Sequence, residues 1–145
     1  MNEAKQVLLV TNSATEAEIT EIKQSIIQAE NHGIKIKVCL VHVIPTLPTC
    51  YFNIPSMVLL AERYYEEAKQ NLTYVGNLLH IAQKDQWLIS GRIRTEVLRL
   101  AHKLQSNFIL ASSASVQDLH KTFLFNREPR NTPIKSFSHL GLALK

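Results

Sequence analysis

The chain has 145 residues, of which 46% are hydrophobic and 19% are charged, and its formal net charge at pH 7 is +4. A chain of this length can bury a core of its own without disulfides or a structural metal, and no apolar run approaches the ~20 residues that a membrane-spanning helix needs. The first residues also lack the pattern of a signal peptide, so we expect one cytoplasmic domain over residues 1–145 that contacts no membrane.

The first third of the chain has the pattern of a strand, a helix and a second strand. Val7–Val10 is a short apolar run, as expected for a strand buried in a parallel sheet. A helix is predicted from about residue 14 to 32, with Ser13 and Glu16 as its capping box. Its apolar stripe consists of Ile19, Ile22, Ile26 and Ala29. Ile34–Val43 alternates with lysines at first and then becomes wholly apolar, which predicts a second strand.

A long loop, a long helix and a third strand follow. Ile44–Pro55 contains three prolines and predicts a loop at the carboxyl edge of the sheet. After it, a spacing of three and four residues predicts a helix of about 25 residues that starts near Ser56. Its stripe consists of Val58, Ala61, Tyr65, Ala68, Leu72, Val75, Leu79 and Ala82. Gln86–Ile89 is predicted to be a short third strand.

The strongest local signal is the segment Ser90–Ser113. After a Ser-Gly turn it has a helical stripe of five apolar residues, namely Ile93, Val97, Leu100, Ala101 and Leu104. Phe108–Ala111 is a continuous apolar run too short for a helix, which predicts a strand buried on both faces. Ligands of open α/β sheets bind beyond the carboxyl ends of the strands, so we expect a binding site, if any, around the residues after Ala111.

The pattern becomes less regular after Ser113. A short helix is predicted over Val116–Phe123, a helical turn or two over Thr132–Phe137, and a last strand over Leu140–Leu144. Strands and helices therefore alternate along the chain. This order predicts an α/β fold with an open parallel five-stranded sheet and helices on both faces.

The residues that could carry chemistry form no catalytic or metal pattern. The six histidines make no HxxxH or HExxH pair, and His42 is expected to be a hydrogen-bonded residue at the end of its strand. Cys39 and Cys50 have no CxxC spacing, so we expect reduced thiols. Ser112 and Ser113 lack the GxSxG elbow of a nucleophile and are expected to cap backbone. We therefore expect no metal, no catalytic residue and no enzymatic activity.

The basic composition raises the question of nucleic-acid binding. The pI is about 9.2, but the basic residues are scattered along the sequence. The one cluster, which is typical of the solvated face of a helix, consists of Arg92, Arg94, Arg99 and Lys103. Nucleic acid is therefore not expected as a partner, and binding through this basic helix face remains the weakest alternative.

Taken in order and spacing, these segments resemble the universal stress protein family over essentially the whole chain. The resemblance rests on the opening strand with its polar turn, the strand end at Val41–Val43, the long loop and helix, the Ser90-Gly91 start, and Val97–Ala101 followed by Phe108–Ser112. It implies an adenine nucleotide alpha hydrolase-like fold with strand order 3-2-1-4-5 and a role in the stress response. It also implies a homodimer through the last strand, with the apolar residues Leu140, Leu142 and Leu144.

The resemblance has a departure that bears on nucleotide binding. Family members that bind ATP carry an aspartate after the first strand and the motif G-x2-G-x9-G-[S/T] after the fourth. Here Asn12 stands at the aspartate position, and Ser112 to Thr132 contains no glycine. Because phosphate needs a close approach of backbone N–H groups, the chain resembles the branch without ATP binding, and no cofactor is expected. The alternative is an adenine-nucleotide binder with an atypical phosphate loop. A residual pocket would be lined by Asn12, Ser13, Val43, Ser112 and Ser113.

Overall fold

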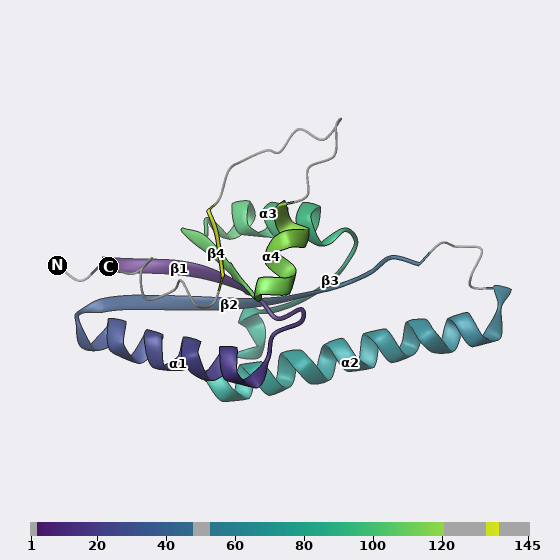
Figure 1. The fold of residues 1–145 in the computed structure, drawn as a ribbon, viewed down its shortest axis with the longest axis horizontal. Coiled ribbons are helices and arrows are strands. Elements are labelled where there is room, and N and C mark those ends of the chain that lie inside the picture. Colours follow the sequence, from purple (N-terminus) through teal and green to yellow (C-terminus); the bar gives the residue numbers. More distant parts are fainter. Residues whose placement is uncertain (1–2, 48–52, 121–132, 137–145) are drawn as a thin grey trace.

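The computed structural model describes residues 3–47, 53–120 and 133–136, and these form one open parallel sheet with helices on both faces (Figure 1). The strand order is β3-β2-β1-β4-β5. The strands are β1 (Glu3–Val10), β2 (Ile34–Ile44), β3 (Gln86–Ser90), β4 (Phe108–Ala111) and β5 (Ile134–Ser136). The helices are α1 (Glu16–Asn31), α2 (Pro55–Leu79), the short 3-10 helix η2 (Gln83–Asp85), α3 (Ile93–Leu104) and α4 (Ser113–His120).

Alternation along the strands divides the core into two layers. The layer under α1 and α2 includes Val7, Leu9, Ile22, Leu40, Leu72 and Leu110. The layer under α3 and α4 includes Leu8, Val10, Val41, Val97, Ala101 and Ile109. Consecutive residues of one strand thus enter opposite layers, which is why the buried strands read as unbroken apolar runs. Figure 1 shows α1 and α2 on one side of the sheet and α3 and α4 on the other.

The expected α/β architecture is confirmed, and most element positions are correct. The first helix runs over Glu16–Asn31 within the expected 14–32. The helix of about 25 residues is α2, which ends at Leu79, so Ala82 lies outside it. None of the helices in the described part of the chain is both long and apolar enough to span a membrane.

The predicted capping box of α1 is wrong. Thr15, not Ser13, is the N-cap, and its side-chain oxygen accepts a hydrogen bond from the backbone N–H of Glu18. The Glu18 carboxylate accepts in return from the Thr15 backbone N–H, at 3.2 Å. Ser13 has a positive φ of 58°, and such a left-handed residue lies in the turn before the helix rather than at its cap.

The end of the described chain also differs from expectation. The helical turn expected over Thr132–Phe137 is wrong where the structure describes it, because Ile134–Ser136 forms β5. This strand pairs in parallel with Ile109–Ala111 of β4, and the Ile109 N–H donates to the Pro133 carbonyl at 2.8 Å. Hydrogen bonding to β4 therefore outweighs the local helix signal of Thr132 and Pro133. The strand expected over Leu140–Leu144 lies outside the described residues, as do the last three residues of the helix expected over Val116–Phe123.

Candidate functional site

The candidate site lies where the carboxyl ends of β1, β2 and β4 meet. The chain leaves β1 towards α1 on one face of the sheet, whereas it leaves β4 towards α4 on the other (Figure 1). β1 and β4 are neighbours in the sheet order, so the topology reverses between them. Such a switch point is where open α/β sheets form their ligand crevice. The polar residues that follow these strands therefore define the site.

Asn12 uses its whole side-chain amide to join β1 to β2. Its Nδ2 donates to the Val43 carbonyl at 2.8 Å, and its Oδ1 accepts from the Val43 N–H at 2.9 Å. These two bonds continue the ladder one step beyond the bond from the Thr11 N–H to the Val41 carbonyl. An aspartate could accept from the Val43 N–H but could not donate to its carbonyl. Asparagine at this position therefore closes the end of the sheet.

Ser112 is the N-cap of α4, as expected for a serine at a strand end. Its Oγ accepts from the Ser115 N–H at 3.2 Å, and its carbonyl accepts from the Val116 N–H at 2.8 Å. The Ser112 and Ser115 hydroxyls both donate to the Asn12 carbonyl, at 3.3 and 2.9 Å. The Ser115 N–H, one of the groups that the start of a helix can offer to an anion, is therefore already hydrogen-bonded.

The structure brings three of the five expected pocket residues into one network. Asn12 bonds Val43 through its side chain and Ser112 through its carbonyl. Ser13 is an exposed residue of the turn after β1, and Ser113 is the first residue of α4. That these five residues line a ligand pocket stays a prediction.

His42 is a hydrogen-bonded residue near the end of its strand, as expected, and its two partners were not expected. Its Nδ1 lies 2.8 Å from the Thr11 Oγ1 and 3.3 Å from the Asn71 Nδ2. The Asn71 Nδ2 also donates to the Thr11 carbonyl at 3.0 Å, which fixes the orientation of this amide. The amide thus presents a donor to Nδ1, so Nδ1 accepts and the ring proton lies on Nε2. Burial lowers the pKa of His42.

Asn71 had no signal of its own in the sequence. It belongs to α2, where it precedes the buried Leu72 of the apolar stripe. A polar residue beside such a stripe is ordinarily solvated. Only the packing of α2 over the end of β2 brings this amide to Thr11 and His42.

Comparison with known proteins supports the fold at low sequence identity. No family model matches the sequence, and no curated protein matches it significantly. A solved universal stress protein family structure from Burkholderia pseudomallei aligns with a TM-score of 0.61 at 15% identity, covering 91% of this chain and 94% of that one. The fold is that of the universal stress proteins.

Two further universal stress protein structures agree with it. One from Archaeoglobus fulgidus has a TM-score of 0.54 at 11% identity and covers 91% of this chain and 97% of that one. A putative universal stress protein from Pseudomonas aeruginosa UCBPP-PA14 has a TM-score of 0.52 at 12% identity. It covers 98% of this chain, which spans 52% of that longer protein.

In this universal stress protein fold, the described residues offer no metal centre and one buried thiol. No group of three or more His, Cys, Asp or Glu side chains in the described part could hold a metal ion. Cys39 is buried in the layer under α3. Burial raises the pKa of its thiol, the Asp85 carboxylate adds to that effect, and Lys37 acts in the opposite direction. Because the thiolate is the reactive form, Cys39 is an inert core residue.

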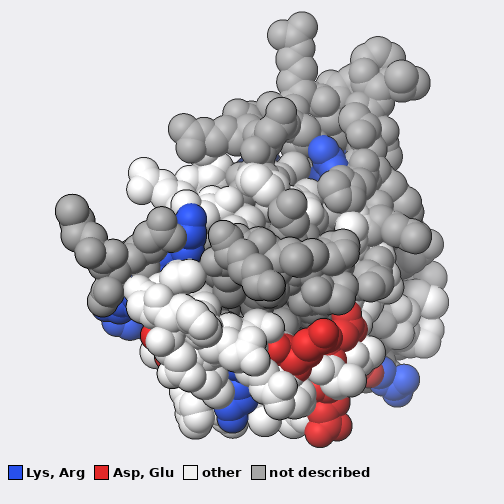
Figure 2. Space-filling model, turned by 60° about the vertical axis from the view of Figure 1, so that its left-hand side comes forward, with Lys and Arg blue, Asp and Glu red and all other residues white. Residues whose placement is uncertain are grey.

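The basic residues of α3 are engaged singly in local contacts. Arg94 donates to the Leu119 carbonyl, and Arg99 lies 3.1 Å from the Glu96 carboxylate. The Lys103 ammonium lies over the Trp87 ring, 5.2 Å from its centroid. On the face drawn in Figure 2, the visible Lys and Arg side chains stand at separate places, whereas most of the visible Asp and Glu side chains gather in one area at the lower right.

Proposed function

We propose that this protein is a cytoplasmic, dimeric binding module of the stress response, like the universal stress proteins, that acts without ATP and without catalysis. The observation that carries the proposal is the closed junction at the carboxyl edge. There the Asn12 amide bonds both backbone groups of Val43, and Ser112 caps α4. Three of the residues predicted to line a residual nucleotide pocket, namely Asn12, Val43 and Ser112, are thus used to hold the sheet and helix together.

The sequence after β4 supports the same proposal. Ser112 to Thr132 contains no glycine, so a phosphate cradle here would need residues with Cβ atoms to adopt positive φ and approach phosphate closely. ATP-binding members of the family use glycines in this segment. The loss of a loop whose backbone N–H groups bind the phosphates weakens anion binding more than the loss of one side-chain contact does.

A role in binding rather than turnover agrees with the polar groups of the site. His42 is the one titratable group in the described hydrogen-bond network, and its Nδ1 is already occupied by the Asn71 amide and the Thr11 hydroxyl. A general base needs a free lone pair within reach of the substrate proton. The local contacts of Arg94, Arg99 and Lys103 argue likewise against a continuous basic surface for nucleic acid.

A calorimetric titration with ATP and magnesium tests the proposal. We expect no binding at millimolar nucleotide and no nucleotide released from the denatured protein, with an ATP-binding universal stress protein as the positive control. Thermal unfolding with the same ligands is a second readout, because a ligand at 100 times its Kd stabilises a fold by about 2.7 kcal/mol. Magnesium-dependent binding with a micromolar Kd would overturn the proposal. It would favour the alternative of a nucleotide binder with an atypical phosphate loop at Asn12, Val43 and Ser112.

A further inference from the structure

The first half of β2 has a neighbouring strand on one side only. β1 pairs with β2 from Ile34 to Val41, whereas β3 pairs with it only from Leu40 to Ile44. Among the described residues, none pairs with the other side of the segment Ile34–Cys39. We name this segment the open edge of β2. It lies at the end of the sheet opposite to the hydrogen bonds between Asn12 and Val43.

The backbone groups that face the open edge follow from strand alternation. The Val41 carbonyl accepts from Thr11 after β1, at 2.9 Å, and the Ile44 carbonyl accepts from Gly91 after β3, at 3.0 Å. Odd-numbered residues of β2 therefore bond towards β1, and even-numbered residues point to the other side. The N–H and C=O groups of Ile36 and Val38 thus point to the open edge. Such groups are a template for an added strand.

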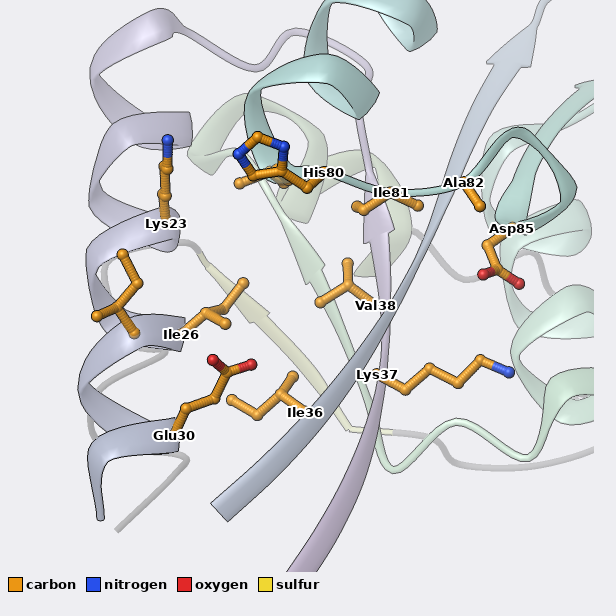
Figure 3. Close-up of a pocket in the computed structure, with 12 residues that line it drawn as sticks. Lys23, Ile26, Glu30, Ile36, Lys37, Val38, His80, Ile81, Ala82 and Asp85 are labelled. Carbon is orange, nitrogen blue, oxygen red and sulfur yellow. The ribbon is translucent and has the colours of Figure 1, made fainter. Parts of the chain in front are cut away.

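A groove of about 630 Å³ lies beside the open edge, between α1, β2 and the segment that follows α2 (Figure 3). Ile36 and Val38 point into it from β2, towards Ile26 of α1. Ile81 lines it from the segment after α2, and Ile27 of α1, which is 48% exposed, lines it as well. Aliphatic side chains of an added strand would enter this groove on the face of Ile36 and Val38.

The opposite face of the open edge is basic. Lys35 and Lys37 are exposed and alternate with Ile36 and Val38, so they lie on the other face of β2. Figure 3 shows Lys37 turned away from α1. Lys37 nevertheless reaches the rim of the groove, whose other charged residues are Lys23, Glu30 and Asp85. Together with Lys35, the edge and its groove carry three basic and two acidic side chains. Acidic side chains of an added strand would therefore be favoured opposite Lys35 and Lys37.

A second copy of this chain fits the open edge poorly. Antiparallel pairing of two such edges about Ile36 would bring Lys35 of one copy beside Lys37 of the other. Like charges directly opposite each other destabilise a strand pair, and lysines on an edge strand are a usual barrier to self-association. The charge pattern thus favours a different, acidic strand.

We propose that the open edge of β2 binds an extended peptide segment of a partner protein in which acidic residues alternate with aliphatic ones. The Ile36 and Val38 backbone pairs with the peptide, the groove takes its aliphatic side chains, and Lys35 and Lys37 face its carboxylates. Main-chain pairing supplies affinity and the alternating side chains supply selectivity. The inference goes beyond the proposed function, since it concerns another surface and depends neither on dimerisation nor on the absence of nucleotide.

The test uses a fluorescent peptide with blocked ends and the sequence Val-Glu-Val-Glu-Val, which has the same pattern in both directions. Saturable binding by fluorescence anisotropy is expected, and the double variant Lys35→Glu, Lys37→Glu should weaken it about tenfold. The peptide Val-Lys-Val-Lys-Val should bind that variant better than the parent. The control Arg63→Glu, Lys69→Glu makes the same charge change at exposed positions of α2 and should leave the affinity unchanged.

Hydrogen exchange locates the bound peptide. The Ile36 and Val38 amides should become protected on binding, whereas the Lys37 amide, which bonds to β1, should not change. Absence of saturable binding, equal weakening in both double variants, or protection elsewhere would each overturn the inference. The Lys35→Glu, Lys37→Glu protein should give the same ATP titration as the parent, so failure here is distinct from failure of the proposed function.

Discussion

At the scale of single residues, His42 couples the end of the sheet to pH. Its Nδ1 accepts from the Asn71 amide and lies 2.8 Å from the hydroxyl oxygen of Thr11, which donates its own proton to the Val41 carbonyl, so a proton added on Nδ1 would face the Asn71 N–H. Burial lowers the pKa of His42 below its ordinary value of 6.5. In the unfolded chain the ring keeps that ordinary value, so at mildly acidic pH the unfolded state binds the proton more readily than the folded state.

We therefore predict that the free energy of unfolding falls as the pH drops below about 6.5. The stabilisation that His42 contributes is complete at pH values above its pKa in the unfolded chain. It is lost as the pH falls towards the lowered pKa of the folded state, by at most about 1.4 kcal/mol per pH unit. His42→Gln keeps an oxygen acceptor for the Asn71 amide and should flatten this slope in urea unfolding between pH ~5 and ~7.5. His32→Gln, at an exposed position after α1, should retain the slope. An unchanged slope in His42→Gln would contradict the prediction.

At the scale of elements, the end of α2 is held by its contact with β3. Gly76 is buried in α2, and a Cβ built there would overlap the Gln86 amide. That amide donates to the Ile81 carbonyl at 3.0 Å. The Gly76 carbonyl accepts from the N–H groups of His80 and Ile81, which ends the helix with His80 in a left-handed conformation.

We predict that Gly76 and Gln86 are energetically coupled. In a helix interior, Gly→Ala ordinarily stabilises by about 1 kcal/mol, but here the new methyl group displaces the Gln86 amide from Ile81. Gly76→Ala should therefore give little or no gain in the parent and close to the full gain in a Gln86→Ala background. Urea unfolding of the parent, both single variants and the double variant measures the coupling. Equal gains in the two backgrounds would mean that no contact opposes the methyl group.

The same elements illustrate what the sequence could and could not predict. Buried strands and amphipathic helices were located well, because their apolar patterns are set by the two-layer core. The end of α2 at Leu79 was missed, since its stop uses His80 where the common signal is glycine. The α1 cap had a signal, Thr15 followed by Glu18, and the equally good pair Ser13 and Glu16 concealed it. β5 was missed because it forms only by pairing with β4.

Three of the residues predicted to line a residual pocket lie close together, but the bonds between them were not predicted. The resemblance pointed to Asn12 and Val43 and the carboxyl-edge rule to Ser112, and hydrogen bonds join all three. The partners of His42 come from the residue after β1 and from α2, about 30 residues away on either side of it. No local pattern specifies such long-range contacts, and they require the packed fold.

At the scale of the whole molecule, we predict a homodimer through the last strand. Leu140, Leu142 and Leu144 lie outside the described residues, and as alternating residues of an edge strand they would form one apolar face. Such a face and its unpaired backbone favour association unless a second copy covers them. Light scattering should give twice the chain mass of 16.5 kDa, and Leu142→Lys should shift the protein towards monomer.

A matched control separates this interface from other apolar surface. Leu59 of α2 is 64% exposed, so Leu59→Lys makes the same chemical change on a surface that the proposed dimer does not use, and it should leave the dimer intact. Replacing an apolar residue of an interface weakens association mainly by speeding dissociation. On dilution, the Leu142→Lys protein should therefore become monomeric at a higher concentration than the parent protein does. A parent that is monomeric at micromolar concentration would refute the dimer. A dimer broken by Leu59→Lys and not by Leu142→Lys would move the interface to α2.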